Sequence, residues 1–410
     1  MNIRTTPQKM SFITELGLVL VLIGMQFGTA LRNIFPDLEL VYVIMGVSVI
    51  CVCNFKNFLN YKFPIYNKWY GLIIIFQFIL LIYAGFADRD DFLFYHLYII
   101  FLTISISSNN RNLIFPNFLR IVLYVSGFIS LVVLYQATFG FNYLNSGGYE
   151  ETGRLWLTEG GDPITIARAL TINIIALLLY KPTLYYEKLL KILFVISSII
   201  GLFSFSTRGA MLALLISFVL YYWNVNGIKS QLSRGEKIKR GAYILAFIVI
   251  LILLYNKSDY FYDKIIAFFD NLSRGITTYF VGAGNNNVDV STMERNLKMK
   301  RVFDTYNDNI SWFNIFFGNG YYTLYIDIPI VQAFFDLGIF GFIYFLITMY
   351  LPFKANIYRT ANYYPYLFIK LCTIQIFLDQ LFNGLPYYFT QYTPIILVIF
   401  FQRNIIFKKN

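Results

Sequence analysis

The feature that most constrains this chain is a series of apolar runs, each about as long as a helix needs to cross a bilayer. A transmembrane α-helix takes roughly 20 consecutive apolar residues, and here the charged residues gather mainly in the short segments between such runs. Only 13% of the residues are charged, whereas soluble domains contain about 25%. This pattern excludes ordinary soluble enzymes, secreted disulfide scaffolds and disordered chains. We therefore expect an all-α, polytopic membrane helix bundle.

The lengths of the apolar runs predict about twelve transmembrane helices. They lie at residues 12–31, 38–54, 69–87, 92–108, 118–138, 163–180, 189–207, 209–224, 241–255, 327–351, 365–383 and 387–406. The chain then divides into residues 1–255 with transmembrane helices 1–9 and an outer loop at 139–162, a large periplasmic loop at 256–326, and residues 327–410 with transmembrane helices 10–12.

Charge in the connecting loops predicts the orientation. Alternate loops carry Lys and Arg, and the loops between them carry acids such as Asp37 and Asp90. Short cytoplasmic loops of membrane proteins are enriched in Lys and Arg, so we expect both termini in the cytoplasm. The net charge of +11 is then mainly a topology signal, and nucleic acid is not an expected partner.

Charged groups at membrane depth are the sharpest functional signal, because each costs at least about 2.5–3.5 kcal/mol at the centre of a helix. Arg168 lies in the sixth span, and Arg208 lies at the outer junction of the seventh and eighth. Arginine is a fitting partner for a diphosphate, so we interpret both as ligand-binding residues. The alternative, that buried charges pair with one another to hold the bundle, stays open for Asp336, Asp379 and Lys370.

The large loop predicts a helix of its own. The sequence Ser291-Thr292-Met293-Glu294 has the form of a capping box, which predicts an amphipathic helix at 292–306 that carries Arg295. The aromatic residues around Trp312 indicate a segment at the membrane surface. Asp327, which follows the loop, is either a helix N-cap or a carboxylate that takes a proton from a sugar hydroxyl.

Other chemistry-bearing residues carry weaker signals. His96 lies within a span and is interpreted as a packed or hydrogen-bonded residue, since one histidine and three cysteines form no metal-binding pattern. Gly318-Asn319-Gly320 is interpreted as a turn rather than a phosphate loop. We therefore expect no metal and no cofactor.

Several short motifs resemble those of the O-antigen polymerase and O-antigen ligase superfamily. Residues 206–212, Ser-Thr-Arg-Gly-Ala-Met-Leu, resemble its "S-R-G-A-x-L" signature. Residues 318–320, 327–332 and 336–341 are similar to its "G-x-G … H-N-x-x-L … E-x-G-x-x-G" pattern. The segment from Arg154 to Pro163 is similar to the family's "R-x-x-G … P-N" outer loop. The ligases carry histidine where this chain has Asp327, so the resemblance favours a polymerase.

The resemblance implies a GT-C-like fold in the bacterial inner membrane and a metal-independent glycosyltransferase. Its partners would be an undecaprenyl-diphosphate-linked oligosaccharide donor, a similar acceptor and, as a further candidate, a chain-length regulator. By this resemblance Arg208 and Arg295 bind the diphosphates, together with Arg168 and Arg154, and Asp327 is the base. The alternatives are a flippase or transporter for the same lipid-linked oligosaccharide, and an O-antigen ligase.

Overall fold

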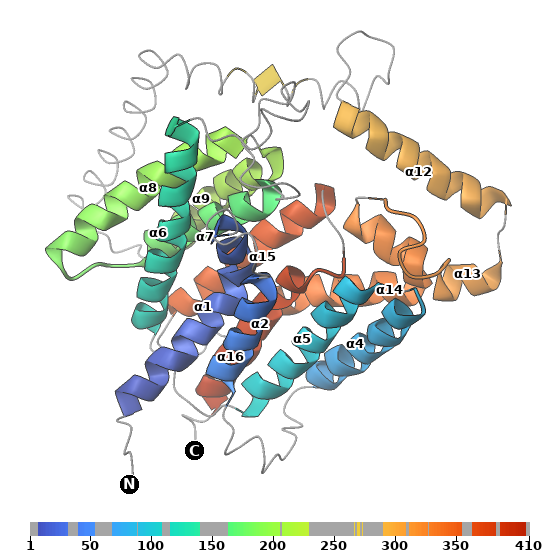
Figure 1. The fold of residues 1–410 in the computed structure, drawn as a ribbon, viewed down its shortest axis with the longest axis horizontal. Helices are drawn as coiled ribbons and strands as arrows, with labels where there is room; N and C mark the ends of the chain where they lie inside the picture. The colour runs from blue at the N-terminus through green and yellow to red at the C-terminus, as the bar shows by residue number, and fades with distance from the viewer. Residues whose placement is uncertain are drawn as a thin grey trace.

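The computed structural model describes residues 7–31, 40–53, 68–87, 89–108, 115–139, 163–205, 207–228, 266, 269–270, 273, 290–308, 311–326, 328–354, 363–382 and 386–406. Within these ranges the chain is helical and contains no strand (Figure 1). The helices are α1 (Pro7–Leu31), α2 (Leu40–Val52), α4 (Lys68–Phe86), α5 (Asp90–Ser108), α6 (Phe115–Phe139), α7 (Pro163–Leu179), α8 (Tyr185–Phe205), α9 (Arg208–Ile228), α12 (Val290–Asp308), α13 (Trp312–Phe317), α14 (Pro329–Lys354), α15 (Tyr363–Phe382), a 3-10 turn η4 (Phe389–Tyr392) and α16 (Thr393–Ile406).

Four described helices are long and apolar enough to cross a membrane. They are Phe12–Leu31, Phe115–Tyr135, Tyr185–Phe205 and Pro329–Phe353. Shorter apolar helices occupy the other predicted spans, at Leu40–Val52, Gly71–Phe86, Phe92–Ile106, Ile164–Leu179, Gly209–Tyr222, Pro365–Leu378 and Phe389–Phe400. The predicted span at 241–255 lies outside the described residues. The all-α membrane class is supported, and the count of about twelve spans stays a prediction.

Glycines bring the first two helices into close contact. A Cβ atom added at Gly17 would lie 2.8 Å from the Cβ of Cys51, and one added at Gly24 would lie 2.6 Å from Cγ2 of Ile44. Small residues let membrane helices approach closely enough for van der Waals packing to hold them. The α1–α2 pair is therefore an antiparallel hairpin packed through its glycine face.

The last two helices of the chain form the centre of the bundle. Every residue from Phe389 to Phe400 is buried, and α16 contacts α1, α5, α14 and α15. A helix that is apolar on all sides has to be surrounded by other helices or by lipid, and α16 satisfies this by packing inside the protein. The first turn of α1 and the last described turn of α16 lie at one end of the molecule, and α12 lies at the other, which we term the α12 end (Figure 1).

Helix α14 is broken at Gly338, which has φ 64° and ψ −154°. The break frees the carbonyl groups of Phe335 and Asp336. These accept hydrogen bonds from the backbone N–H groups of Asn319, at 2.8 Å, and Gly320, at 3.2 Å. We name residues 318–326 the interlocked loop, because its first residues fill the break in α14. The turn predicted at residues 318–320 is confirmed.

Helix α12 confirms the helix predicted at 292–306. It begins at Val290 and ends at Asp308, so it starts one residue before Ser291. Its residue Val302 is buried with Ile326 and Phe335. The helix thus packs on the interlocked loop and on the first half of α14.

Candidate functional site

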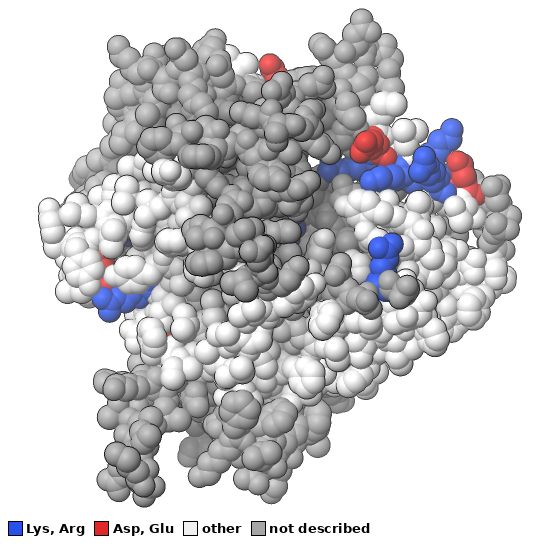
Figure 2. Space-filling view, in the orientation of Figure 1, with Lys and Arg blue, Asp and Glu red and all other residues white. Residues whose placement is uncertain are grey.

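Helix α12 directs two cations toward the bundle. Arg295 and Lys298 are half-buried, and they lie seven and four positions before buried Val302, so the three residues share one helix face. Lys300 and Arg301 are exposed. Figure 2 shows the basic side chains of α12 as one patch, with acidic side chains beside them. The inward face of α12 therefore places positive charge above the interlocked loop.

Below α12 the interlocked loop presents tyrosine rings. The Nζ atom of Lys298 lies 4.5 Å from the ring centre of Tyr325, and the guanidinium carbon of Arg89 lies 4.6 Å from the ring centre of Tyr322. The Tyr322 ring also contacts Phe92, with 5.3 Å between ring centres. Cations are attracted to the faces of aromatic rings, so these contacts join the turn before α5, the loop and α12.

Tyr322 has an unusual backbone conformation. Its φ is 56°, the one positive φ of a non-glycine residue in the described chain. For a bulky residue such a conformation costs of order 1–3 kcal/mol and needs support from its surroundings. The support comes from Asp336, whose carboxylate faces the backbone N–H of Tyr322.

Asp336 is fully buried and anchors the interlocked loop. Its carboxylate oxygens accept hydrogen bonds from Nε2 of Gln332, at 2.8 and 2.9 Å, and from the hydroxyl of Tyr387, at 2.8 Å. Gln332 also donates to the carbonyl of Leu324 and accepts from the N–H of Ile326. Asp336 is thus bound by neutral donors and not by Lys370, the pairing that the sequence had left open.

A second polar network lies beside the first. His96 Nδ1 lies 2.7 Å from Oε1 of Gln77, and His96 Nε2 lies 2.9 Å from the hydroxyl of Tyr321. Because an amide oxygen only accepts, Nδ1 carries the proton and Nε2 accepts from Tyr321. Gln77 in turn donates to the Tyr344 hydroxyl at 3.1 Å. The interpretation of His96 as a hydrogen-bonded packing residue is confirmed.

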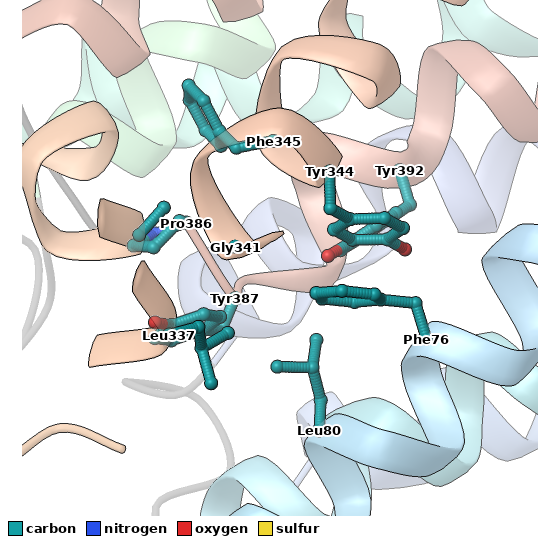
Figure 3. A pocket seen from close by; sticks show the side chains of 10 residues that line it. Phe76, Leu80, Leu337, Gly341, Tyr344, Phe345, Pro386, Tyr387 and Tyr392 are labelled. Atoms are coloured by element: carbon teal, nitrogen blue, oxygen red, sulfur yellow. The ribbon is translucent and has the colours of Figure 1, made fainter. Parts of the chain in front are cut away.

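The tyrosines of the two networks meet at a small pocket. The rings of Tyr321 and Tyr387 lie 4.6 Å apart, and burial raises the pKa of the Tyr321 phenol. Figure 3 shows Phe76 of α4 stacked against Tyr344 of α14, with Tyr387 on another side of the pocket. The lining is mostly apolar, so this pocket is a packing gap under the loop and offers few groups for chemistry.

The predicted arginines occupy two regions. Arg168 is 5% exposed on α7, and its carbonyl accepts a hydrogen bond from Nε2 of Gln375 on α15 at 3.0 Å. Arg208 is the first residue of α9, and its side chain lies outside the described residues. Helices α7 and α9 contact each other, and Ala167 and Ala210, which lie near their starts, belong to one apolar cluster.

Arg295 lies apart from these two, on α12. Arg154 and Asp327 lie outside the described residues. The structure thus places Arg168 and Arg208 on two helices that contact each other, α7 and α9, and places Arg295 on a third helix, α12. In the part of the chain that is described, no group of three or more His, Cys, Asp or Glu residues is arranged to hold a metal ion.

Sequence reasoning overlooked Arg89, Tyr322 and Tyr387. Arg89 stands among Asp88, Asp90 and Asp91, so it is hidden in an acidic turn. The tyrosines are hidden by the abundance of Tyr in the chain, 34 residues. One signal was available, since two glycines flanking a single residue predict a turn in which neighbours adopt unusual backbone angles.

Scans against known protein families and against curated proteins found no match to this chain. The resemblance to the O-antigen polymerase and ligase superfamily therefore rests on its short motifs.

Proposed function

We propose that this protein is a polysaccharide polymerase of the bacterial inner membrane, which joins undecaprenyl-diphosphate-linked repeat units on the periplasmic face. The observation that carries the proposal is the pair Arg295 and Lys298, which α12 holds on its inward face above a fixed tyrosine-rich loop. Helices α7 and α9, which bear Arg168 and Arg208, lie at the left of the bundle in Figure 1, and α12 lies at the upper right.

The chemistry requires stabilised negative charge. A hydroxyl oxygen of the acceptor sugar bonds to the anomeric carbon of the donor, and the bond from that carbon to the diphosphate breaks. The diphosphate leaves with the electron pair, so preorganised cations lower the barrier. Arginine suits this role because its planar guanidinium binds phosphate oxygens in pairs. In this proposal Arg208 and Arg295 bind the diphosphates, Arg168 and Arg154 assist, and Asp327 accepts the hydroxyl proton.

The proposal includes the topology. About twelve spans with both termini cytoplasmic place α12 and the interlocked loop in the periplasm. The lipid carrier then stays in the bilayer while its sugars reach the α12 end. In this proposal the large loop at 256–326 keeps out water, which would otherwise hydrolyse the donor.

A flippase for the same lipid-linked oligosaccharide is the second candidate. The break in α14 at Gly338 favours it, because discontinuous helices form the substrate sites of many transporters. The lipid-linked intermediates of cells that lack the protein distinguish a polymerase from a flippase. Loss of a polymerase leaves single repeat units on the outer face, whereas loss of a flippase leaves them in the cytoplasmic leaflet, and a ligase defect leaves long lipid-linked polymer.

The direct test is elongation of purified lipid-linked repeat units by the purified protein, read as a ladder of product lengths. Arg208→Ala and Arg295→Ala should abolish long products while the protein still inserts and purifies. Arg301→Ala is the matched control, because Arg301 lies on the same helix but is exposed, and it should elongate as the unmodified protein does. Chelator should not change the ladder. Equal ladders from the Arg295→Ala and Arg301→Ala proteins would remove Arg295 from the site.

A further inference from the structure

We propose that Tyr322 and Tyr325, with Arg89 and Lys298, form a subsite that binds an acidic sugar of the glycan. We name these four residues the sugar subsite. The inference rests on the proposed function, in which a glycan is the substrate, and adds to it the class of sugar and the residues that hold it.

The backbone conformation at Tyr322 shows that the turn does not require a tyrosine side chain at this position. With φ 56° the turn is one that glycine makes without strain, and Gly318 and Gly320 in the same loop have positive φ. A tyrosine here strains the backbone, and the buried Asp336 network is arranged to support it. Strain of this kind concentrates at functional sites. The ring is therefore the part of Tyr322 that needs an explanation.

The two rings form a surface at the α12 end. Their centres lie 5.9 Å apart with 43° between the planes. Tyr325 is 40% exposed and Tyr322 is half-buried, whereas Phe92 behind Tyr322 is buried. A pyranose ring packs its C–H groups on an aromatic face and bonds its hydroxyls to nearby polar groups, and tyrosine offers both an apolar face and a hydroxyl. Two neighbouring tilted rings fit successive sugars of a chain.

The charges beside the rings select for an acid. Arg89 and Lys298 each lie over one of the two rings, and Arg295 lies on the same face of α12 as Lys298. The described carboxylates of α12, Glu294 and Asp304, are on exposed positions of that helix. In this proposal a sugar displaces the two cationic groups from the ring faces, and its carboxylate then binds the displaced guanidinium and ammonium through charge-assisted hydrogen bonds. Arg89 is flanked in the sequence by Asp88, Asp90 and Asp91, so the excess positive charge beside the rings comes from Lys298 and Arg295. This charge favours a uronic acid over a neutral sugar.

The test is calorimetric titration of the purified full chain, in nanodiscs of zwitterionic lipid, with a galacturonic acid hexamer and with maltohexaose as the neutral probe. We expect the acidic hexamer to bind at least about ten-fold more tightly than maltohexaose, a difference that added salt reduces. Lys298→Ala should weaken binding of the acid about ten-fold, the size expected of a lost charged contact. Lys300→Ala, on an exposed position of α12, should not.

The Tyr322→Gly and Tyr322→Phe variants distinguish the contribution of the Tyr322 ring to binding from its contribution to stability. Tyr322→Gly relieves the strained backbone and removes the ring, so the melting temperature should stay close to that of the unmodified protein while binding of the acid is lost. Tyr322→Phe keeps the ring and should retain binding. Equal binding of both hexamers, no binding of the acidic hexamer, or unchanged binding by the Tyr322→Gly and Lys298→Ala proteins would overturn the subsite.

Elongation of lipid-linked repeats by the same preparations distinguishes the two proposals. A protein that elongates but fails the titration refutes the sugar subsite alone. A protein that binds the acidic hexamer but elongates nothing refutes the polymerase and leaves the subsite.

Discussion

The contact between the interlocked loop and the break in α14 predicts a large loss of stability from a single methyl group. Gly318 has φ 80° and ψ −176° and Gly338 has φ 64° and ψ −154°, a region that is essentially restricted to glycine. A Cβ at Gly318 would overlap the carbonyl oxygen of Asp336, and one at Gly338 would overlap the backbone of Phe316. Neither overlap is with a flexible side chain, so the backbone itself would have to move.

The expected magnitude for Gly318→Ala follows from the groups involved. The unfavourable backbone region costs about 1–2 kcal/mol. Moving the loop away breaks the bonds from Asn319 to Phe335 and from Gly320 to Asp336, each worth about 0.5–1.5 kcal/mol net. The free energy of unfolding should therefore fall by about 2–5 kcal/mol.

Thermal unfolding in detergent measures this loss. Cys53 and Cys372 are buried and Cys51 is half-buried, so the increase in labelling by a thiol-reactive fluorophore reports when the bundle opens. Gly46→Ala is the matched control, because Gly46 lies in α2 with no atom near its added Cβ, and alanine in a helix should be neutral or slightly stabilising. If Gly318→Ala melted at the same temperature as Gly46→Ala, the interlocked geometry would be wrong.

Two further predictions concern other parts of the fold. Gly24→Leu should separate α1 from α2 and lower the free energy of unfolding by about 1–3 kcal/mol, because its Cβ already lies 2.6 Å from Ile44; Gly46→Leu, with open space at that position, should leave the same melting curve unchanged. Burial raises the pKa of Tyr321 above its unfolded value, so the stability that Tyr321 contributes is present below about pH 10 and is lost as pH rises through its folded pKa. The melting temperature should therefore fall less steeply from pH 8 to 11 for Tyr321→Phe than for the unmodified protein. Parallel curves for the two proteins would contradict this assignment.

The helical elements were predictable because their signal is local. A run of apolar residues long enough to cross a bilayer has few alternatives to a helix, so the segments in the described residues lie where the hydropathy placed them. The helix at α12 was predictable from the sequence Ser291-Thr292-Met293-Glu294, and the observed helix begins slightly earlier, at Val290. The aromatic residues of α13 are exposed, with Trp312 at 78% and Phe313 at 65%, and their position at the membrane surface stays a prediction.

The polar networks were not predictable, because their partners are far apart in the sequence. His96 bonds to a tyrosine 225 positions away, and Asp336 bonds to one 51 positions away. No local pattern specifies such pairs. The sequence placed Asp336 at membrane depth and offered charged partners for it, and the structure supplies neutral donors instead.

The break in α14 connects these networks to the candidate site. Backbone that is not helical is tolerated at membrane depth only where protein buries it or a cavity hydrates it, and here the N–H groups of Asn319 and Gly320 occupy the freed carbonyls. The loop that makes this repair is the one on which α12 rests through Val302. The positions of Arg295 and Lys298 are therefore set by a hydrogen-bonded anchor at Asp336 that no substrate needs to touch. It follows that Asp336→Asn, which keeps the side-chain volume but exchanges one acceptor for a donor, should disturb the α12 end more than its conservative size suggests.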